Sequence, residues 1–545
     1  MTLRIDRRSL VKGGAFGLGA LLLPGGSTAL AQLVAARGFT HNVASGEPAQ
    51  DSVLLWTRYV PAQGASAHVH AEISDTADFR RIVAGGDVIT GPWRDWTAKV
   101  TVAGLEPGRP YFYRFTASGE VSPIGRTRTL PEGRVPEWRM AVFSCANLPF
   151  GYFNAYAHAA QRDDLHLGIH LGDYLYEYKR GTYPSERDAV AARVLEPANE
   201  LIHLADYRTR YACYRADPDL QALHARLPII PSVDDHETAN DSWEGGAENH
   251  NPGEGDYTER KIAAMQAWRE WMPVSDKPYA TYEIGDLGTY FRTETRLIGR
   301  GQAPSLEAAL KGAADPVAAL TAFRDGAWAD PARSMMGTTQ EHWLAEELHR
   351  SVRARKRWQV VGVGTIVGRQ VAPPEAANWI SPDAADYIAA RIKAALLAAK
   401  LGLPSDFDSW GGYPAARARL LQAAQAADAD LVILAGDSHN AWGFELSQDG
   451  KRAGVEFDGH SVTSPGYESF FRQEPPTDIS TALVRANPEL KWCSTAGRGY
   501  MTVTLTPEAA TSEWLFMDTV IGRSTQVART HRMRTRAGRR TLEAA

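Results

Sequence analysis

The sequence lacks several features that mark specialised protein classes. Its 545 residues include only three cysteines, too few for a disulfide scaffold, and the odd number leaves at least one thiol unpaired or bound to a metal. Charge of neither sign dominates, because 59 Lys and Arg stand against 64 Asp and Glu, and the body of the chain has no long basic run. Specific nucleic-acid binding is therefore not expected. With 44% hydrophobic and 23% charged residues, the composition also excludes a disordered chain, a collagen-like fibre and a polytopic membrane protein.

Residues 1–31 have the pattern of an export signal. The pair Arg7-Arg8, in the run DRRSLVK, precedes an apolar run at 13–23, and the small-residue site Ala29-Leu30-Ala31 follows. The pair matches the twin-arginine pattern, and cleavage is expected after Ala31. A transmembrane anchor is not expected, because a run this short cannot cross about 30 Å of hydrocarbon. We therefore predict that the twin-arginine export machinery delivers the protein, already folded, to the periplasm or the medium.

The mature chain divides into two predicted domains. From 38 to 131, short β-rich segments such as 52–58, 98–103 and 111–116 alternate with turn residues, which is typical of a β-sandwich. From 138 to 530, strands alternate with helices, which indicates an α/β domain with buried strands. Its predicted strands are 138–143, 165–171, 227–233 and 430–435, and its predicted helices are 153–162, 260–271, 384–399 and 415–427. Residues 301–332 are expected to be a helical insertion without chemistry.

Potential metal ligands follow the four predicted strands of the α/β domain. They are Cys145, then Asp173 with Tyr176, then Asp235-His236 with Asn240, and finally Asp437 with His439. In open α/β sheets, ligands bind beyond the carboxyl ends of the strands, so we expect these side chains to converge. Thiolate, phenolate, carboxylate and imidazole together suit a Lewis-acidic transition metal, whereas carboxylate and amide oxygens suit calcium or magnesium. Two adjacent cations can orient a phosphate ester and generate a hydroxide nucleophile.

The order of these motifs resembles a diverged calcineurin-type metallophosphoesterase. The motifs are Gly-Asp-x-x-Tyr at 172–176, Asp-His-Glu at 235–237 and Gly-Asp-x-His at 436–439. The departures from the usual superfamily motifs are similar to the alkaline phosphatase D (PhoD-like) family. That pattern also covers FSCANLPFGYFNAY (143–156), HLGDYLYEY (170–178), VDDHETAN (233–240) and AGDSHNAW (435–442). The segment at 41–58 resembles the family's N-terminal β-domain, so the resemblance spans nearly the whole mature chain.

The resemblance implies a layered β core flanked by helices, and an exported alkaline phosphatase that cleaves phosphomonoesters and phosphodiesters with a metal-bound hydroxide. It implies Fe³⁺ and Ca²⁺ as cofactors and phosphate esters, including phospholipids or other phosphodiesters, as substrates. Cys145 and Tyr176 would then be ligands of iron and Asp173 a bridging ligand. The remaining ligands would be Asp235 or Asn240, Asp437 and His439. One departure is the stretch 408–413, where Gly411 stands at the position expected to be acidic.

Several alternatives remain open from the sequence alone. His236 is expected to contact phosphate or the leaving group, although a structural histidine would fit the same position. The acidic loop 241–256 is either a lid or a solvated loop, and Cys213 and Cys493 are expected to be free thiols unless export pairs them. A phospholipase D-type phosphodiesterase would use the same ligands, and a non-catalytic periplasmic binding protein of the same fold would not need them all.

Overall fold

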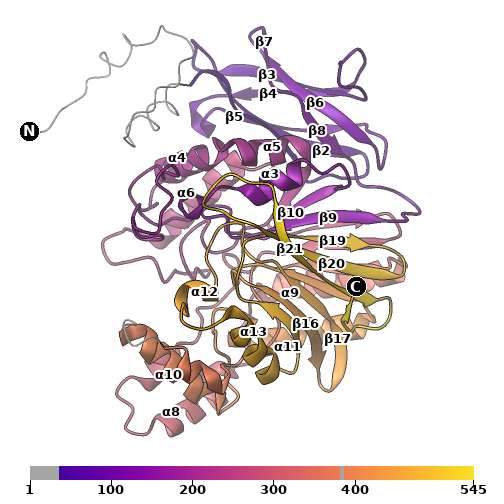
Figure 1. Cartoon of the computed structure of the whole chain (residues 1–545). Helices are drawn as coiled ribbons and strands as arrows, with labels where there is room; N and C mark the ends of the chain where they lie inside the picture. Colours follow the sequence, from indigo (N-terminus) through magenta and orange to yellow (C-terminus); the bar gives the residue numbers. More distant parts are fainter. Residues whose placement is uncertain (1–35, 381–385) are drawn as a thin grey trace, which may run out of the picture.

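The computed structural model describes residues 36–380 and 386–545 (Figure 1), so the predicted export signal at 1–31 lies outside the described residues. Within these ranges, the predicted alternation of strands and helices is confirmed, including helical structure in the insertion at 301–332. Among the helices of these ranges, none combines the length and the apolar character needed to cross a bilayer.

The first of two large sheets carries three of the four predicted site strands. Its ten strands lie in the order β22, β21, β20, β19, β9, β10, β11, β1, β2 and β5. The three site strands β9, β10 and β11 are parallel, so their carboxyl ends meet at one edge. The bounds are β22 (Glu543–Ala544), β21 (Val527–Arg536), β20 (Ala509–Met517), β19 (Gly499–Leu505), β9 (Trp138–Phe143), β10 (Leu167–His170), β11 (Pro228–Pro231), β1 (Gly38–Gly46), β2 (Ser52–Val60) and β5 (Thr97–Ala103).

The second large sheet carries the fourth site strand, β15. Its seven strands lie in the order β12, β13, β14, β15, β17, β16 and β18, and β13, β14, β15 and β17 are parallel. The bounds are β12 (Ala280–Ile284), β13 (Gly288–Arg292), β14 (Trp358–Gly362), β15 (Leu431–Ala435), β17 (Lys451–Asp458), β16 (Ala441–Gln448) and β18 (Leu490–Ser494). Apolar side chains of both sheets form one buried cluster, including Val142 and Ile169 from the first sheet and Val432 and Phe457 from the second. The two sheets therefore pack face to face.

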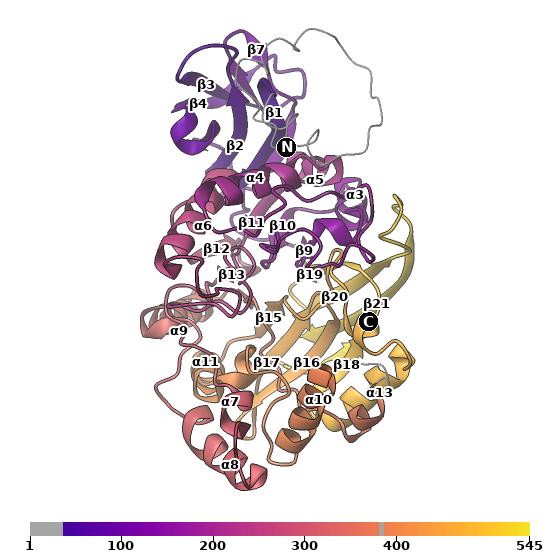
Figure 2. The same ribbon diagram turned by 90° about the vertical axis from the view of Figure 1, so that its left-hand side faces the viewer.

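Helices cover the outer faces of both sheets (Figure 2). The first sheet is covered by α3 (Asn154–Ala160), α4 (Leu204–Arg215), α5 (Pro218–Arg226) and α6 (Tyr257–Trp271). The second sheet is covered by α9 (Gly337–Arg353), α11 (Pro414–Ala427) and α13 (Pro476–Ala486). The remaining helices are α7 (Leu306–Leu310), α8 (Pro316–Phe323), α10 (Asp386–Ala399) and α12 (Tyr467–Phe470). The result is the predicted layered β core flanked by helices.

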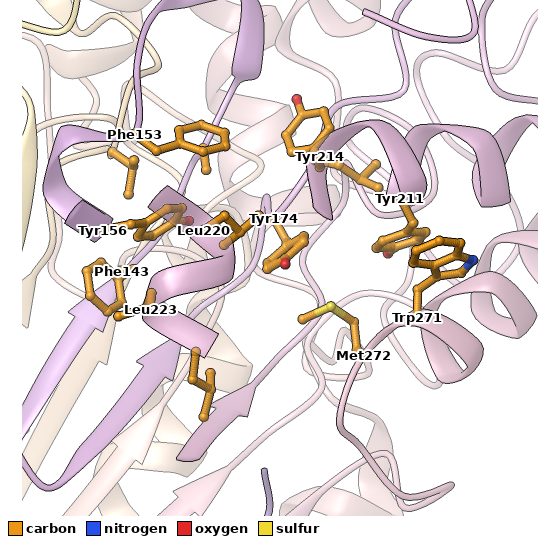
Figure 3. Packing of buried hydrophobic residues seen from close by; sticks show 14 of the residues in the cluster. Phe143, Phe153, Tyr156, Tyr174, Tyr211, Tyr214, Leu220, Leu223, Trp271 and Met272 are labelled. Carbon is orange, nitrogen blue, oxygen red and sulfur yellow. The ribbon is translucent and has the colours of Figure 1, made fainter. Parts of the chain in front are cut away.

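The helix layer over the first sheet is held by an aromatic core. Figure 3 shows Phe143 of β9 beside Tyr156 of α3, and the ring centroids of this pair are 5.1 Å apart. The same core includes Tyr174, two residues from Tyr176 in the site loop, and Tyr211 and Tyr214 of α4. The loop that carries Asp173 and Tyr176 is thus anchored by large buried rings.

The N-terminal strands form a sandwich that shares a sheet with the α/β core. A third sheet packs against β1, β2 and β5 over a buried cluster that includes Val53, Leu55, Val69 and Phe115. Its strands are β4 (Ile82–Thr90), β3 (Ala67–Ser74), β6 (Pro110–Ala117), β7 (Glu120–Val121) and β8 (Gly125–Arg128). Because β1 pairs in parallel with β11, the first sheet runs without a break from the sandwich to the site strands. The domain limits 38–131 and 138–530 stay a prediction.

Candidate metal centre

The candidate ligands converge where strands of the two large sheets end. Cys145 follows β9, Asp173 follows β10 and Asp235 follows β11, whereas Asp437 follows β15 of the facing sheet. Close packing of the strand ends requires glycine at Gly172, which has a φ of 113°. A Cβ there would lie 2.4 Å from Cβ of Asp234.

The backbone is left-handed at four of the candidate ligands. The φ angles are 58° at Cys145, 54° at Asp173, 63° at Asp437 and 59° at His439. Non-glycine residues rarely adopt this conformation, and such strained positions cluster at functional sites because the surrounding structure must hold them there. The strand-end turns therefore aim these side chains at one another at an energetic cost.

One part of the cluster, here called the thiol–phenol end, consists of Cys145, Tyr176 and His439 beside Asp173. The sulfur of Cys145, a carboxylate oxygen of Asp173 and a ring nitrogen of His439 lie within 4.8 Å of one another. Tyr176 donates its hydroxyl hydrogen to Asp173 Oδ2 at 3.1 Å, and the same hydroxyl lies 3.1 Å from His439 Nε2. His439 Nδ1 donates to the carbonyl oxygen of Pro465 at 2.9 Å, so the lone pair of the neutral ring lies on Nε2.

Burial keeps the thiol–phenol end uncharged in the protein alone. Burial, and then the carboxylate of Asp173, raise the pKa values of Cys145 and Tyr176 well above their usual range. Burial likewise raises the pKa of Asp173 well above normal, and Oδ1 of this residue accepts no hydrogen bond within the described residues. Burial and the nearby Arg498 lower the pKa of His439 to about 3. A cation would reverse the balance for the three acidic groups, because it stabilises thiolate, phenolate and carboxylate together.

The other part, here called the carboxylate end, consists of Asp234, Asp235 and Asp437 beside Asp173. One oxygen from each of these four residues lies within 4.8 Å of the others. This end also contains the completely buried guanidinium of Arg296. Nε and Nη2 of Arg296 lie 2.6 and 3.1 Å from the two oxygens of Asp234. Nη2 also lies 3.8 Å from Oδ1 of both Asp235 and Asp437.

The loop 408–413 holds this guanidinium in place. Asp408 forms ion pairs with both Arg296 and Arg300, and Arg300 also donates to the carbonyl oxygen of Asp408 at 2.6 Å. Gly411 contributes no side chain, but its carbonyl oxygen accepts a hydrogen bond from Trp328 Nε1 at 2.9 Å. The loop therefore has no acidic side chain at 411, but it still contacts the carboxylate end because Asp408 pairs with Arg296.

His236 lies between the two ends of the cluster. A ring nitrogen of His236 lies within 4.8 Å of carboxylate oxygens of Asp173 and Asp235. Its Nδ1 is 2.7 Å from Oε2 of the buried Glu177, and the ring lies 4.1 Å from that of Tyr176, measured between centroids. Burial alone would lower the pKa of His236, but Asp235, Glu177 and Asp173 together raise it well above the normal value. The geometry allows either a metal ligand or a proton donor at this position.

Asn240 is connected to the cluster through its backbone, and among the described residues its side chain forms no hydrogen bond with another candidate ligand. Its side-chain amide donates to Glu248 Oε2 at 3.2 Å, and its backbone N–H donates to Glu177 Oε1 at 2.8 Å. Asn249 donates to the same oxygen of Glu177 at 2.7 Å. The loop 241–256 is therefore tied through Glu177 to His236.

Three residues of the site are not among those predicted from the sequence: Asp234, Glu177 and Arg296. Asp234 directly precedes Asp235 at the end of β11, so a second ligand position was readable there. Glu177 directly follows Tyr176, but nothing local indicates its contact with His236. Arg296 follows β13, and only the knowledge that β13 is a parallel strand of the facing sheet would have placed it here.

The donors suit two kinds of cation. Thiol, phenol and imidazole donors at the thiol–phenol end fit a transition metal, and the oxygen donors at the carboxylate end fit a hard cation such as calcium. Asp173 belongs to every group of potential ligands found in the described residues, and one of its two oxygens is buried without a hydrogen-bond partner, so this carboxylate is placed to serve both cations.

Known proteins share both the sequence and the fold. A model of the PhoD-like phosphatase family matches residues 140–514, and a model of the N-terminal domain of PhoD-like phosphatases matches residues 26–131. The chain is 31% identical to alkaline phosphatase D of Bacillus subtilis (strain 168) over 514 residues, which cover 88% of this chain and 77% of that protein. A solved structure of PhoD is similar with a TM-score of 0.76 and 27% identity, over 94% of this chain and 92% of the other. The match at 140–514 contains every candidate ligand.

Proposed function

Since the chain belongs to the PhoD-like phosphatase family and is a phosphoric ester hydrolase, we propose that its reaction takes place at the cluster around Asp173. Membership sets aside the non-catalytic binding protein that the sequence left open. The observation that carries the proposal is that Asp173 belongs to all three groups of potential metal ligands in the described residues. A carboxylate in that position can serve two cations at once.

In this proposal, Cys145, Tyr176 and His439 would hold Fe³⁺, Asp173 would serve both ions, and Asp235 or Asn240 would hold Ca²⁺ together with Asp437. Trivalent iron is favoured because thiol and phenol, which burial keeps protonated, need a strongly polarising ion to act as anionic ligands. The cations would polarise the phosphoryl oxygens and make water acidic enough to serve as the nucleophile.

His236 is proposed to contact the phosphate and to supply a proton to the leaving oxygen. Glu177 accepts from Nδ1 and thereby fixes the ring, while Tyr176 packs against its face. This arrangement resembles the general case in which a carboxylate orients a histidine and stabilises its protonated form. Proton donation matters most for esters whose leaving group is a poor one.

Arg296 is proposed to set the charge of the carboxylate end. It neutralises part of the charge on Asp234, Asp235 and Asp437 without occupying Asp173. The hard cation would then meet fewer uncompensated negative charges than the aspartate count indicates.

We further propose that the protein is exported by the twin-arginine route and is periplasmic or secreted. It would hydrolyse both phosphomonoesters and phosphodiesters. The export part is supported by Arg7-Arg8 and the site Ala29-Leu30-Ala31. Because this route carries folded proteins, the metals would be loaded before the protein leaves the cytoplasm.

The experiment compares two aspartates that have the same backbone conformation. Asp173 and Asp428 have φ angles of 54° and 55°, and asparagine tolerates this left-handed region. Asp428 carries an 86% exposed side chain far from the ligand groups, so Asp428→Asn controls for the amide substitution and the backbone strain. Hydrolysis of a chromogenic phosphate monoester and diester is measured together with bound iron and calcium.

Asp173→Asn is expected to lose both activities and to bind less of both metals, while Asp428→Asn behaves as the unmodified protein does. Folding should persist in both variants, because a domain of this size has a sufficient apolar core. Normal turnover by folded Asp173→Asn would show that the reaction takes place elsewhere.

A further inference from the structure

A cavity separate from the candidate ligands lies beside α6, where this helix meets β5 and the ends of β11 and β13. It has a volume of about 780 Å³, within the roughly 300–1,000 Å³ usual for small-ligand sites. It is enclosed by α6, by the short 3-10 helix η2 (Pro92–Arg94), by β5 and by the segments that follow β11 and β13. None of the candidate metal ligands lines it.

One end of this cavity is cationic. Lys99, Arg94 and Arg269 line it, and burial together with these two arginines lowers the pKa of Lys99 to about 8. Of the acidic groups near Lys99, Asp276 lines the cavity and lies 3.7 Å from Arg269, whereas Glu47 forms an ion pair with Arg292. Arg292 also lines the cavity, and its buried Nε has no acceptor among the described residues. Among the residues that line the cavity, six are Lys or Arg and three are Asp or Glu, so positive charge exceeds negative charge.

The other end is apolar and open to solvent. Ile262 and Ile298 are 61% and 42% exposed, and Lys261 Nζ lies 3.4 Å from the carbonyl oxygen of Leu297, which brings the two isoleucine segments together. Trp93, which is next to Arg94 in η2, also lines the cavity and is 56% exposed. Exposed large apolar side chains that gather in one hollow usually mark a binding site.

The two ends are joined along one face of α6. Ile262, Met265 and Arg269 are spaced at three and four residues, so they lie on the same side of the helix and all line the cavity. At 1.5 Å per residue, Ile262 and Arg269 are about 10 Å apart along the helix axis. The cavity thus changes from apolar to cationic over roughly this length.

We propose that this cavity binds a single-chain anionic amphiphile, with the phosphate-type headgroup at Lys99, Arg94 and Arg269 and the hydrocarbon chain along Met265, Ile262 and Ile298. Charge complementarity selects the headgroup, and the exposed apolar residues select the chain. The ligand would not be a substrate in this position, because no candidate metal ligand lines the cavity. The segment 231–233 lines the cavity and is directly followed by Asp234 and Asp235, so the bound ligand would stiffen the strand end that carries them.

The test is calorimetric titration of the mature protein with dodecylphosphonate below its micelle-forming concentration. This probe has a carbon–phosphorus bond, so phosphate ester hydrolysis cannot consume it. Methylphosphonate supplies the headgroup alone, and dodecyl maltoside supplies the same chain with a neutral head. Dodecylphosphonate is expected to bind at least about tenfold more tightly than either partial probe, because only it uses both ends of the cavity.

Two pairs of variants locate the binding. Ile262→Asp is matched with Ile89→Asp, since both isoleucines are 61% exposed and Ile89 lies on β4 outside the cavity. The double variant Arg94→Gln/Arg269→Gln is matched with Arg80→Gln/Arg81→Gln, whose side chains are 88% and 77% exposed. Both cavity variants should weaken binding of dodecylphosphonate about tenfold or more and leave hydrolysis of a soluble monoester unchanged, while both control variants bind normally.

Asp173→Asn separates this site from the catalytic cluster, because it should bind dodecylphosphonate as the unmodified protein does. Three results would overturn the proposal: equal affinity in Ile262→Asp and Ile89→Asp, equal affinity for dodecyl maltoside, or loss of binding in Asp173→Asn. The last result would mean that the phosphonate occupies the catalytic cluster.

Discussion

The two ends of the candidate centre are built from different donors and are balanced differently. At the thiol–phenol end, Cys145 and Tyr176 are buried without a protein cation in hydrogen-bond contact with either of them among the described residues, and their pKa values are raised by burial and by Asp173. At the carboxylate end, the buried Arg296 binds Asp234 through two nitrogens and faces Asp235 and Asp437. Burial still raises the pKa of Asp437, whereas Arg296 and His236 overcome burial and lower that of Asp235.

The two ends therefore differ in how much their charge balance depends on an added cation. At the thiol–phenol end, burial keeps the pKa values of Cys145 and Tyr176 raised although the buried Arg498 lies near both, so the anionic form requires a metal ion. The carboxylate end carries its own positive charge and can fold with its aspartates partly paired. Asp173 belongs to both ends, and for that reason its loss should be more damaging than the loss of any residue of a single end.

The largest losses of activity are expected for alanine substitutions of Asp173 and Asp437. Asp173→Ala should remove activity and both metals, whereas Asp437→Ala should remove activity by at least the ~10²–10³-fold typical of one lost electrostatic contact and lower calcium more than iron. Turnover and metal content of the two proteins are measured side by side. Equal loss of both metals in Asp437→Ala would break the distinction between the two ends.

A second prediction concerns His236, which lies between the ends. His236→Ala should retain both metals and lose turnover by about two to four decades, the usual range for a positioned acid–base group. The defect should be smaller for a nitrophenyl phosphate than for an alkyl phosphate, because a nitrophenolate leaves without a proton. If metal content falls instead, His236 is a ligand; if both substrates are cleaved normally, it is structural.

A third prediction concerns Arg296. Arg296→Met leaves the buried Asp234 without its partner, whereas Asp408 keeps Arg300, and the loss of one partner of a buried ion pair typically costs about 3–5 kcal/mol of folding free energy. Calcium should then raise the melting temperature of the variant more than that of the unmodified protein, because the added ion replaces the lost charge. Thermal denaturation with and without calcium measures both effects.

Arg109→Met is the control for Arg296→Met. Arg109 pairs with Glu106 at the surface, where both side chains are about half exposed, and such pairs contribute only about 0–1 kcal/mol. An Arg296→Met protein as stable as this control, and equally insensitive to calcium, would show that the guanidinium does not balance the carboxylate end.

The smallest loss of activity is expected when calcium is removed under mild conditions. A chelator selective for calcium should lower activity reversibly and leave iron bound, because in the proposed arrangement only oxygen donors would hold calcium, whereas a thiolate and a phenolate would hold iron. Activity is followed through chelation and calcium readdition, with iron content as the control. Simultaneous loss of both metals would indicate a single shared site.

The sequence was informative wherever the site depends on local order. Asp173 and Asp437 each follow a glycine at the end of a buried strand, so their type and position were readable, and the structure brings both into one group. The alternation of strands and helices likewise predicted the α/β core. These features depend on residues close together in the chain.

Features that depend on distant pairing were not readable. Arg296 joins the site only because β13 is parallel to β14 in the sheet that faces the first one, and it pairs with Asp408 more than a hundred residues away. The parallel pairing of β1 with β11 also has no local signal, although it extends the first sheet into the N-terminal sandwich. Glu177 was missed for the same reason, since its partner His236 lies on a different strand end.

We propose that the thiol–phenol end holds ferric iron, and this is tested by the iron content and the visible absorption of the protein purified from its native compartment. We expect bound iron in proportion to protein and a charge-transfer band that is lost or shifted in Tyr176→Phe and altered in Cys145→Ser. A colourless, iron-free protein that hydrolyses phosphate esters at full rate would contradict it.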